Sequence, residues 1–304
     1  MSSWHRHLSA IGARWAQLVM AFLAVAVPAP DAFAQAPAEL KTRFEAVRQA
    51  TKDNPFSRDV FLQSTESSDE LKGDVFALVD HPYQKLAESL KQPGNWCHVL
   101  SLHINTKSCV AQAREAPTQM VVHVGRKFDQ PLKDAYEIAF AFQLKSATPE
   151  YFLARMEAPT GPLATRDYRI GLEAMPWEGN RSLVHLTYAY GFGMAGKVAM
   201  KGYLATLGSG KVGFTVTGRG ADGKVSYIDG VRGVVERNTM RYYLAIDAYL
   251  GSLREAPPQQ VDHRLKTWFD ATEAFPRQLH ELDWPEYLAM KRSELARQQQ
   301  AASR

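Results

Sequence analysis

The chain has 304 residues, of which 36 are basic and 32 acidic, so its formal net charge is only +4. Such a balance argues against a dedicated nucleic-acid-binding protein, because those proteins carry a basic stripe. The length suits one large domain, or one domain with an appendage.

The N-terminus has the pattern of a secretory signal peptide. Residues 1–14 contain arginine and no acid, residues 15–27 are mostly apolar, and Ala32-Phe33-Ala34 gives a small-residue cleavage sequence. We expect cleavage after Ala34 and export to the periplasm, with no membrane insertion afterwards. The alternative is an uncleaved anchor. The apolar run is shorter than the roughly 20 residues that span a bilayer, and Pro28 and Pro30 end it.

Residues 35–69 are interpreted as a leader helix and a linker, with an amphipathic stretch over residues 38–50. Residues 71–80 then predict a strand, which His81-Pro82 ends. A proline suits the first turn of a helix, so a short helix follows, and a second runs to Leu100.

Cys97 and Cys109 are the only cysteines of the chain. An exported protein with two thiols usually joins them, so we expect a disulfide. Two free buried thiols and a metal pair are the alternatives. The spacing is far from C-x-x-C, and no H-E-x-x-H motif occurs, so no metal site is predicted.

The central part of the chain alternates between apolar and polar residues, which is typical of an antiparallel sheet with one apolar face. The predicted strands are 120–128, 136–144, 151–157, 166–175 and 183–192, followed by a helix over 195–208 and a strand over 211–217. The strongest helical pattern spans Glu236–Leu253, and residues 259–304 predict further helices.

The segment from Gly73 to Pro82, together with Leu86, Leu90 and Asn95-Trp96, resembles the opening strand and helix pair of the START-like superfamily (SRPBCC), which includes polyketide cyclases and Bet v 1-like proteins. The resemblance covers roughly residues 70–253, with Glu236–Leu253 as the closing helix. It implies an α+β helix-grip fold, in which an antiparallel sheet curls around a long C-terminal helix. The expected organisation is a signal peptide (1–34), a leader (35–69), a START-like domain (70–256) and a helical C-terminal extension (257–304).

The resemblance also implies a cavity between the sheet and the closing helix. Aromatic residues on the apolar strand faces are the candidate ligand-binding residues: Tyr136, Phe140, Phe142, Tyr168, Tyr188 and Tyr190. An ordinary packed core is the alternative. Arg155 is a further candidate if it points inward with its charged neighbours, rather than lying solvated on the outer face.

Arg237 and Arg241 are one turn apart on the predicted closing helix and therefore share a face. A guanidinium grips a carboxylate or phosphate in bidentate fashion, so the pair is a candidate clamp for an anionic ligand group at the cavity mouth. The alternative is surface ion pairing with Glu236 or Glu173.

The predicted function is binding or carriage of a hydrophobic or amphipathic, lipid-like molecule, without a cofactor and with no assigned catalytic residue. One alternative is a cyclase- or hydrolase-type enzyme using the same cavity, although no G-x-S-x-G motif occurs. Another is a partner-binding module whose C-terminal helices present apolar residues: Trp268, Phe269, Leu279 and Trp284. The glycines of residues 191–196 are interpreted as a turn or bulge and not as a dinucleotide motif.

Overall fold

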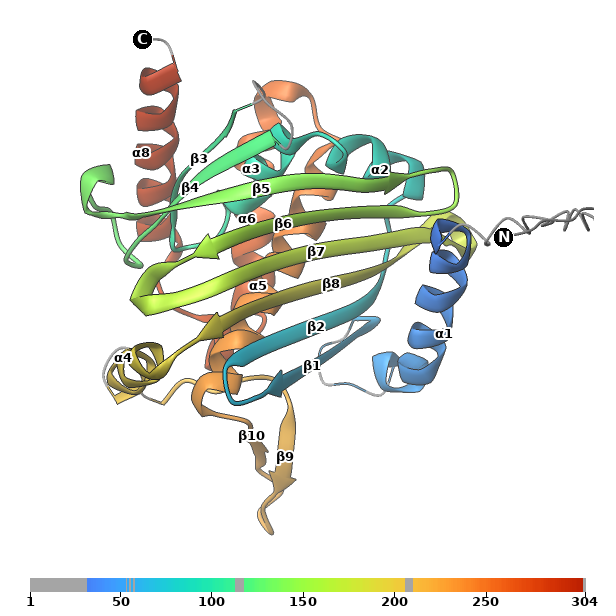
Figure 1. Ribbon diagram of the computed structural model, residues 1–304, viewed down its shortest axis with the longest axis horizontal. Helices are drawn as coiled ribbons and strands as arrows, with labels where there is room; N and C mark the ends of the chain where they lie inside the picture. The colour runs from blue at the N-terminus through green and yellow to red at the C-terminus, as the bar shows by residue number, and fades with distance from the viewer. Residues whose placement is uncertain are drawn as a thin grey trace, which may run out of the picture.

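The computed structural model describes residues 32–52, 54, 56, 58–112, 118–205 and 210–302. Eight antiparallel strands form one sheet in the order β1-β2-β8-β7-β6-β5-β4-β3 (Figure 1). The strands are β1 Val60–Glu66, β2 Glu70–Val79, β3 Thr106–Gln112, β4 Thr118–Val124, β5 Tyr136–Ala147, β6 Phe152–Thr160, β7 Thr165–Trp177 and β8 Arg181–Phe192. A separate hairpin consists of β9 Val216–Arg219 and β10 Val225–Tyr227.

Helices cover both faces of the sheet. The long helix α5 crosses the inner face, together with the short helices that follow β2 and the C-terminal helices, and α5 and α6 lie behind the sheet in Figure 1. The helices are α1 Ala32–Lys52, α2 Tyr83–Leu90, α3 Pro93–Leu100, α4 Met194–Ala205, α5 Gly230–Ser252, α6 Gln260–Glu273, α7 Pro276–Leu279 and α8 Trp284–Ala302. This arrangement confirms the predicted α+β helix-grip fold.

The alternation of β8 shows how the sequence sets the two faces. Val184, Leu186 and Tyr188 point to the inner core, whereas Leu183 packs on the outer face with Phe44 of α1. Both faces of this strand are therefore buried, and none of its residues is fully exposed. Successive side chains of a strand point to opposite faces, so a single strand can serve two cores.

The closing helix approaches the sheet very closely at one glycine. A Cβ atom added to Gly73 of β2 would lie 2.2 Å from Oγ1 and 3.1 Å from Cβ of Thr239 in α5. Only glycine leaves room for the helix at this crossing. The contact fixes the height at which α5 crosses β2.

Several element boundaries differ from the sequence-based predictions. Helix α5 begins at Gly230, six residues before Glu236, so Arg237 is not in its first turn. Residues 60–66, predicted as linker, form the edge strand β1, and the predicted strand over 211–217 is replaced by the β9–β10 hairpin. The expected signal peptide lies outside the described residues, except that residues 32–34 begin α1.

The C-terminal extension is part of the same core as the sheet. Trp268 and Tyr287 are almost fully buried. Two buried lysines, Lys107 of β3 and Lys291 of α8, bind opposite oxygens of Glu294 at 2.8 and 2.9 Å. Burial lowers the pKa of Lys291 to about 8. This group of three charges holds α8 against the sheet edge.

The predicted disulfide between Cys97 and Cys109 is confirmed. It joins α3 to β3, with the two Cα atoms 5.2 Å apart. In the chain-entropy model, closing so short a loop stabilises the fold by about 3 kcal/mol. Among the described residues, no helix is both long and apolar enough to cross a membrane.

Candidate ligand-binding site

Four tyrosines form a cluster between the sheet and α5. Tyr168 of β7 stacks on Tyr190 of β8 with ring centroids 5.3 Å apart, and Tyr188 lies 5.6 Å from Tyr190. Tyr242 of α5 lies 5.3 Å from Tyr188 on the other side. The sequence predicted the three strand residues, whose alternate positions place them on one face.

The cluster borders a narrow space beside α5. Tyr242 is partly exposed by surface area, although it lies deep enough in the protein that burial raises its pKa above the ordinary value. Asn238 lies one turn before Tyr242 on the same side of α5, and Val234 lies two turns before it. Both are also partly exposed. A side chain that is deep in the fold yet accessible to a water-sized sphere must face a gap in the packing.

Fewer of the aromatic residues are accessible than the sequence suggested. Phe140, Phe142 and Tyr188 are at most 6% exposed. Three hollows on the described part of the chain lie elsewhere, and none is lined by the tyrosines of the sheet. Most of the aromatic face is therefore packed as an ordinary core, and only its part near Tyr242 is open.

A buried histidine closes one side of this gap. His103 is 4% exposed, and its ring stacks on Tyr242 at 5.0 Å. Its Nδ1 accepts the backbone N–H of Asn105 at 3.2 Å, which leaves the proton on Nε2. That Nε2 has no hydrogen bond of normal geometry, although the Asn238 amide approaches it.

The charge state of His103 follows from its surroundings. Burial lowers its pKa well below the ordinary value, and the positive charges of Arg241, Lys291 and Lys127 lower it further. The ring is therefore neutral at physiological pH. It offers one N–H donor, through Nε2, to a group in the gap.

The two predicted arginines are buried rather than poised at an open mouth. Arg241 pairs with Glu281 of the C-terminal extension at 2.9 Å, and Arg237 donates to the Val212 carbonyl at 3.3 Å. The predicted partner Glu173 lies on the outer face of the sheet, so the alternative of surface pairing with it is wrong. Glu236 is also buried, where it accepts the backbone N–H groups of Phe214 and Thr215.

The remaining predicted residues lie in three different places. Phe142 packs near Trp96, away from the tyrosine cluster, and Phe140 makes an edge contact with Tyr168. Tyr136 lies at the start of β5 on the rim and is 42% exposed. Arg155 is exposed on the outer face, because Ala154 and Met156 occupy the inward positions of β6. The structure thus separates Arg155 from the aromatic set.

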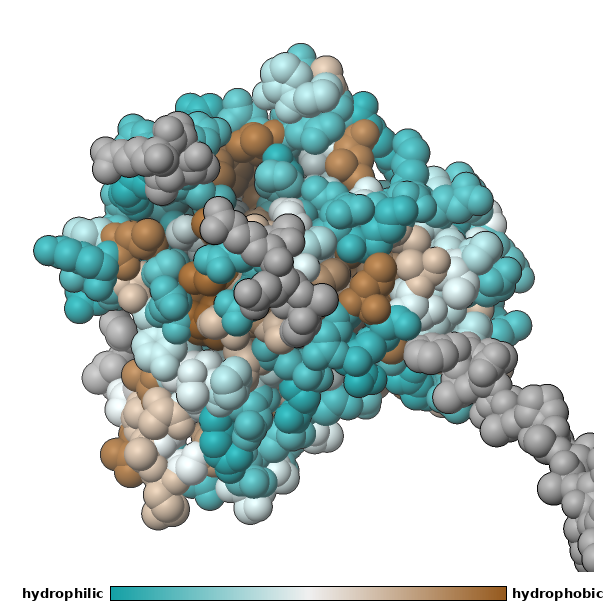
Figure 2. Space-filling model, turned by 45° about the horizontal axis from the view of Figure 1, so that its top comes forward, coloured by the Kyte–Doolittle hydropathy of each residue, from teal (hydrophilic) through white to brown (hydrophobic). Residues whose placement is uncertain are grey.

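Exposed apolar side chains gather at the sheet end where β5 and β7 begin. Met194 and Val198 of α4 are 77% and 69% exposed, and Phe128, Leu132 and Leu163 on neighbouring connections are also exposed. Figure 2 shows hydrophobic side chains over α4, at the lower left. Single exposed apolar residues are common, but several at one end mark a candidate contact surface.

A second charged group lies on the outer face beneath α1. Nε2 of His185 lies 2.9 Å from Asp74 Oδ1, and Nδ1 faces both Glu173 and Arg43. Burial opposes the protonated ring, but bonds to Asp74 and Glu173 outweigh it and raise the pKa of His185. Arg43 of α1 also pairs with Glu173. The group fastens α1 to the sheet.

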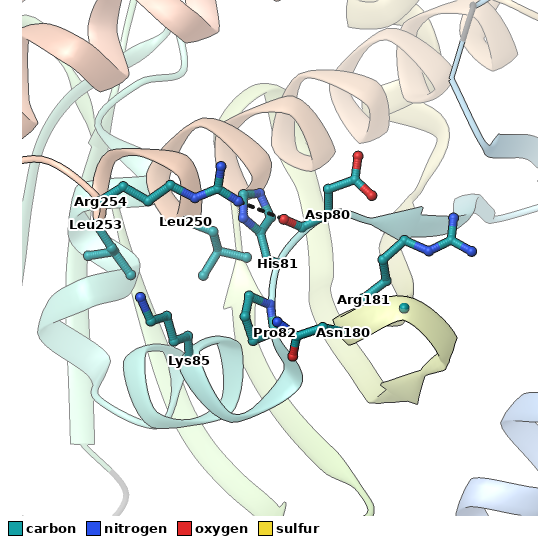
Figure 3. A pocket seen from close by; sticks show the side chains of 10 residues that line it. Asp80, His81, Pro82, Lys85, Asn180, Arg181, Leu250, Leu253 and Arg254 are labelled. Carbon is teal, nitrogen blue, oxygen red and sulfur yellow. Dashed lines mark hydrogen bonds between the residues drawn. The ribbon is translucent and has the colours of Figure 1, made fainter.

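A surface hollow lies at the opposite sheet end, where β2 ends and β8 begins (Figure 3). Its volume is about 230 Å³, and Lys85, Arg181 and Arg254 point around it. His81 at its edge bonds Asp247 at 2.8 Å. Its lining combines these cations with Asp80 and His81 and includes no Ser, Thr or Cys.

Sequence reasoning missed several residues of the inner site. The sequence does not single out Tyr242 and Asn238, because an amphipathic helix is expected to bury one face only. The structure buries α5 on nearly all sides. Lys127 and Glu281 gave no local signal, since their partners are distant in the sequence.

No protein-family model matches the sequence, and no curated protein matches it at a significant level. Solved structures are similar in fold. Norcoclaurine synthase of Thalictrum flavum has 13% identity and a TM-score of 0.35, over 47% of this chain and 92% of that chain. Human StAR-related lipid transfer protein 5 has 8% identity and a TM-score of 0.29, over 52% and 81%.

A third similar structure is the Zhui aromatase/cyclase from a Streptomyces species, with 10% identity and a TM-score of 0.29, over 71% of this chain and 96% of that one. At these identities the likeness concerns the fold alone. The strand order and the long closing helix of this chain agree with the helix-grip arrangement that was expected, whereas the likeness to these structures carries no information on what this chain binds.

Proposed function

We propose that the protein binds a hydrophobic or amphipathic small molecule between the sheet and α5, with its apolar part against Tyr188 and Tyr242. The observation that carries the proposal is the partly accessible surface of Tyr242, Asn238 and Val234 on one side of α5, next to the tyrosine cluster. Packed cores rarely leave such surface beside four aromatic rings. Binding sites for small molecules combine apolar walls with few polar groups in this way.

His103 supplies the polar group that would orient the ligand. Nε2 of His103 has only the nearby Asn238 amide and no hydrogen bond of normal geometry, and a buried donor left unsatisfied costs about 1–3 kcal/mol. A ligand with a hydroxyl or carbonyl oxygen would satisfy it. The molecule would thus lie with an oxygen at His103 and its apolar part along the tyrosines.

The ligand would enter from the sheet end at which Met194, Val198 and Phe128 are exposed. Tyr168 and Tyr190 lie toward this end, since β7 begins and β8 finishes there. Apolar side chains at an entrance lower the cost of bringing an apolar ligand out of water. Of the four residues behind the partner-binding alternative, Trp268 and Leu279 are 3% exposed and pack within this chain, whereas Phe269 and Trp284 are partly exposed.

We also propose that binding takes place in the periplasm, after cleavage behind Ala34. The basic, apolar and A-x-A pattern of residues 1–34 supports this, and a disulfide is typical of exported proteins. The intact mass of the protein from a periplasmic extract tests it. A chain starting at Gln35 is the expected result, and one still starting at Met1 in the membrane fraction contradicts the proposal.

The neutral fluorescent probe N-phenyl-1-naphthylamine tests the binding site. We expect its emission to rise on binding, and Asn238→Phe, which fills the gap, to weaken binding at least 10-fold. Leu253→Phe is the matched control, because it narrows the surface hollow of Figure 3 instead. Melting temperatures of both variants report whether the fold is kept.

The two substitutions separate the possible sites. Loss of binding in Leu253→Phe with retention in Asn238→Phe would move the site to the surface hollow. Equal binding by both variants would contradict an inner site. Native mass spectrometry of the protein purified from periplasm then identifies the bound molecule by mass.

A further inference from the structure

Three cations from three separate elements converge on one carboxylate. Glu281, between α7 and α8, accepts Lys127 Nζ at 2.7 Å and Arg241 at 2.9 Å, with Lys211 Nζ at 3.8 Å. The Glu281 side chain is only 9% exposed. Lys127 follows β4, Arg241 belongs to α5 and Lys211 precedes β9, so the acid joins parts of the domain that are far apart in the sequence.

Positive charge exceeds negative charge at this point. Burial lowers the pKa of Lys211, and the charges of Lys127, Arg241 and Arg237 lower it further, with Glu281 as the one opposing charge. The pKa of Glu281 is lowered in turn, because Arg241 and Lys127 outweigh its burial. A single carboxylate therefore holds together a cluster that carries more charge than it can neutralise.

The cluster adjoins the proposed ligand site. Ile104, the residue after His103, lines the same small hollow as Arg241 and Glu281, and the charges of Arg241 and Lys127 lower the pKa of His103. His103 in turn stacks on Tyr242, which borders the gap. The cations therefore lie at the end of the gap that already contains its one unsatisfied polar group.

Glu281 has the position and chemistry of an internal substitute for a ligand. Its carboxylate comes from the C-terminal extension, which the common helix-grip fold lacks. Arginine and lysine recognise carboxylate and phosphate oxygens in the same way. The helices around Glu281 have their own anchors: Lys107 and Glu294 hold α8, and the Trp268 indole donates to the Arg241 carbonyl.

We propose that Lys127, Lys211 and Arg241 form the site for the oxyanion head group of an amphipathic ligand, a carboxylate or phosphate, and that Glu281 occupies this site until the ligand displaces it. The inference rests on the proposed function. The apolar part of the ligand would lie at Tyr242 and Tyr188, and its head group would take over the ion pairs of Glu281. The closed site would then favour anionic over neutral amphiphiles.

The test compares three ligands that share the oleyl hydrocarbon chain and differ in the head group: oleate, oleyl phosphate and oleyl alcohol. Each is measured by its displacement of N-phenyl-1-naphthylamine. In Glu281→Gln, which removes the internal competitor, we expect oleate or oleyl phosphate to bind at least 10-fold more tightly than in the wild type. Oleyl alcohol should change less than twofold. The preferred anion distinguishes a carboxylate from a phosphate site.

Two further variants make the test decisive. Lys127→Gln should weaken the anionic ligands about 10-fold and leave the alcohol unchanged, and it decides the question if Glu281→Gln does not fold. Glu255→Gln, whose carboxylate lies near His263 on the surface instead, is the matched control. Unchanged ratios of anion to alcohol in both Glu281→Gln and Lys127→Gln would overturn the inference while the proposed function stands. Failure of the folded wild type to bind the neutral probe would instead refute the proposed function.

Discussion

His103 and His185 are both buried, yet they lie on opposite sides of the sheet and in opposite electrostatic surroundings. His185 lies between two carboxylates, Asp74 and Glu173, and its pKa is raised. His103 has cations around it, and its pKa is lowered. Both ring nitrogens of His185 have polar partners, whereas Nε2 of His103 has no hydrogen bond of normal geometry.

The difference distinguishes a structural polar network around His185 from a candidate binding site around His103. Around His185, Thr187 also donates to Asp74 at 2.8 Å and the ring stacks on Phe76, so the polar groups satisfy one another. Such closed groups hold elements together. At His103 the Nε2 donor lacks a hydrogen bond of normal geometry, and the neighbouring Tyr242 is partly accessible. Burial and a shifted pKa alone would not distinguish the two.

The largest effect is expected from Asp74→Asn. The carboxylate is 4% exposed and pairs with both His185 and Lys72. Its loss leaves a buried cation beside a neutral amide, so we expect the free energy of unfolding to fall by about 3 kcal/mol. Urea denaturation measures this. Asp222→Asn, at the exposed tip of the β9–β10 hairpin, is the control and should change stability little. If Asp74→Asn lowered the free energy of unfolding by less than 1 kcal/mol, the polar network around His185 would not be what stabilises this side of the sheet.

The sheet and closing helix were predictable because their signals are local. Alternation along 136–144 and 183–192 fixes which side chains share a face, and the same parity placed Tyr168, Tyr188 and Tyr190 together. The disulfide was predictable because a chain with two cysteines allows one pairing. Strand β1 was missed, since Val60–Glu66 is short and follows a polar stretch.

The electrostatic part of the site was not predictable from the sequence. The sequence offered Glu236 or Glu173 as acidic partners of Arg241, as the alternative to a ligand, but the actual partner, Glu281, is 40 residues away in the C-terminal extension. Lys107 and Glu294 are 187 residues apart. No periodicity marks such pairs, because they arise only when α6 and α8 pack against α5 and β3.

The second prediction applies one substitution to both histidines. Phenylalanine keeps a ring of similar shape and removes the polar atoms. His185→Phe removes one partner from each of two carboxylates, leaving Asp74 with Lys72 and Glu173 with Arg43, and should cost about 2 kcal/mol. His103→Phe loses the bond from the Asn105 N–H but also removes an unsatisfied donor, so it should cost at most about 1 kcal/mol. Equal losses in urea denaturation would contradict the contrast between the two groups.

The smallest effect is a difference in the sign of the pH dependence. A raised pKa means that His185 contributes its full stability below the unfolded value of about 6.5, and that this contribution is lost as the pH rises through the folded pKa. A lowered pKa means that His103 contributes above about 6.5 and that its contribution is lost as the pH falls. The lowered pKa values of Asp74 and Glu173 keep both carboxylates charged in this range.

The two variants should therefore move the pH profile of stability in opposite directions between pH 5 and 7.5. Compared with the wild type, His103→Phe should lose less stability on acidification, because no buried ring next to Arg241, Lys127 and Lys291 resists protonation. His185→Phe should lose more, because the contribution that favours low pH is gone. The upper limit of pH 7.5 keeps Lys291, with its pKa of about 8, largely protonated. Urea unfolding at four pH values gives, for each variant, the difference in the free energy of unfolding from the wild type as a function of pH. If these differences change with pH in the same direction for both variants, the two histidines do not differ as their surroundings require.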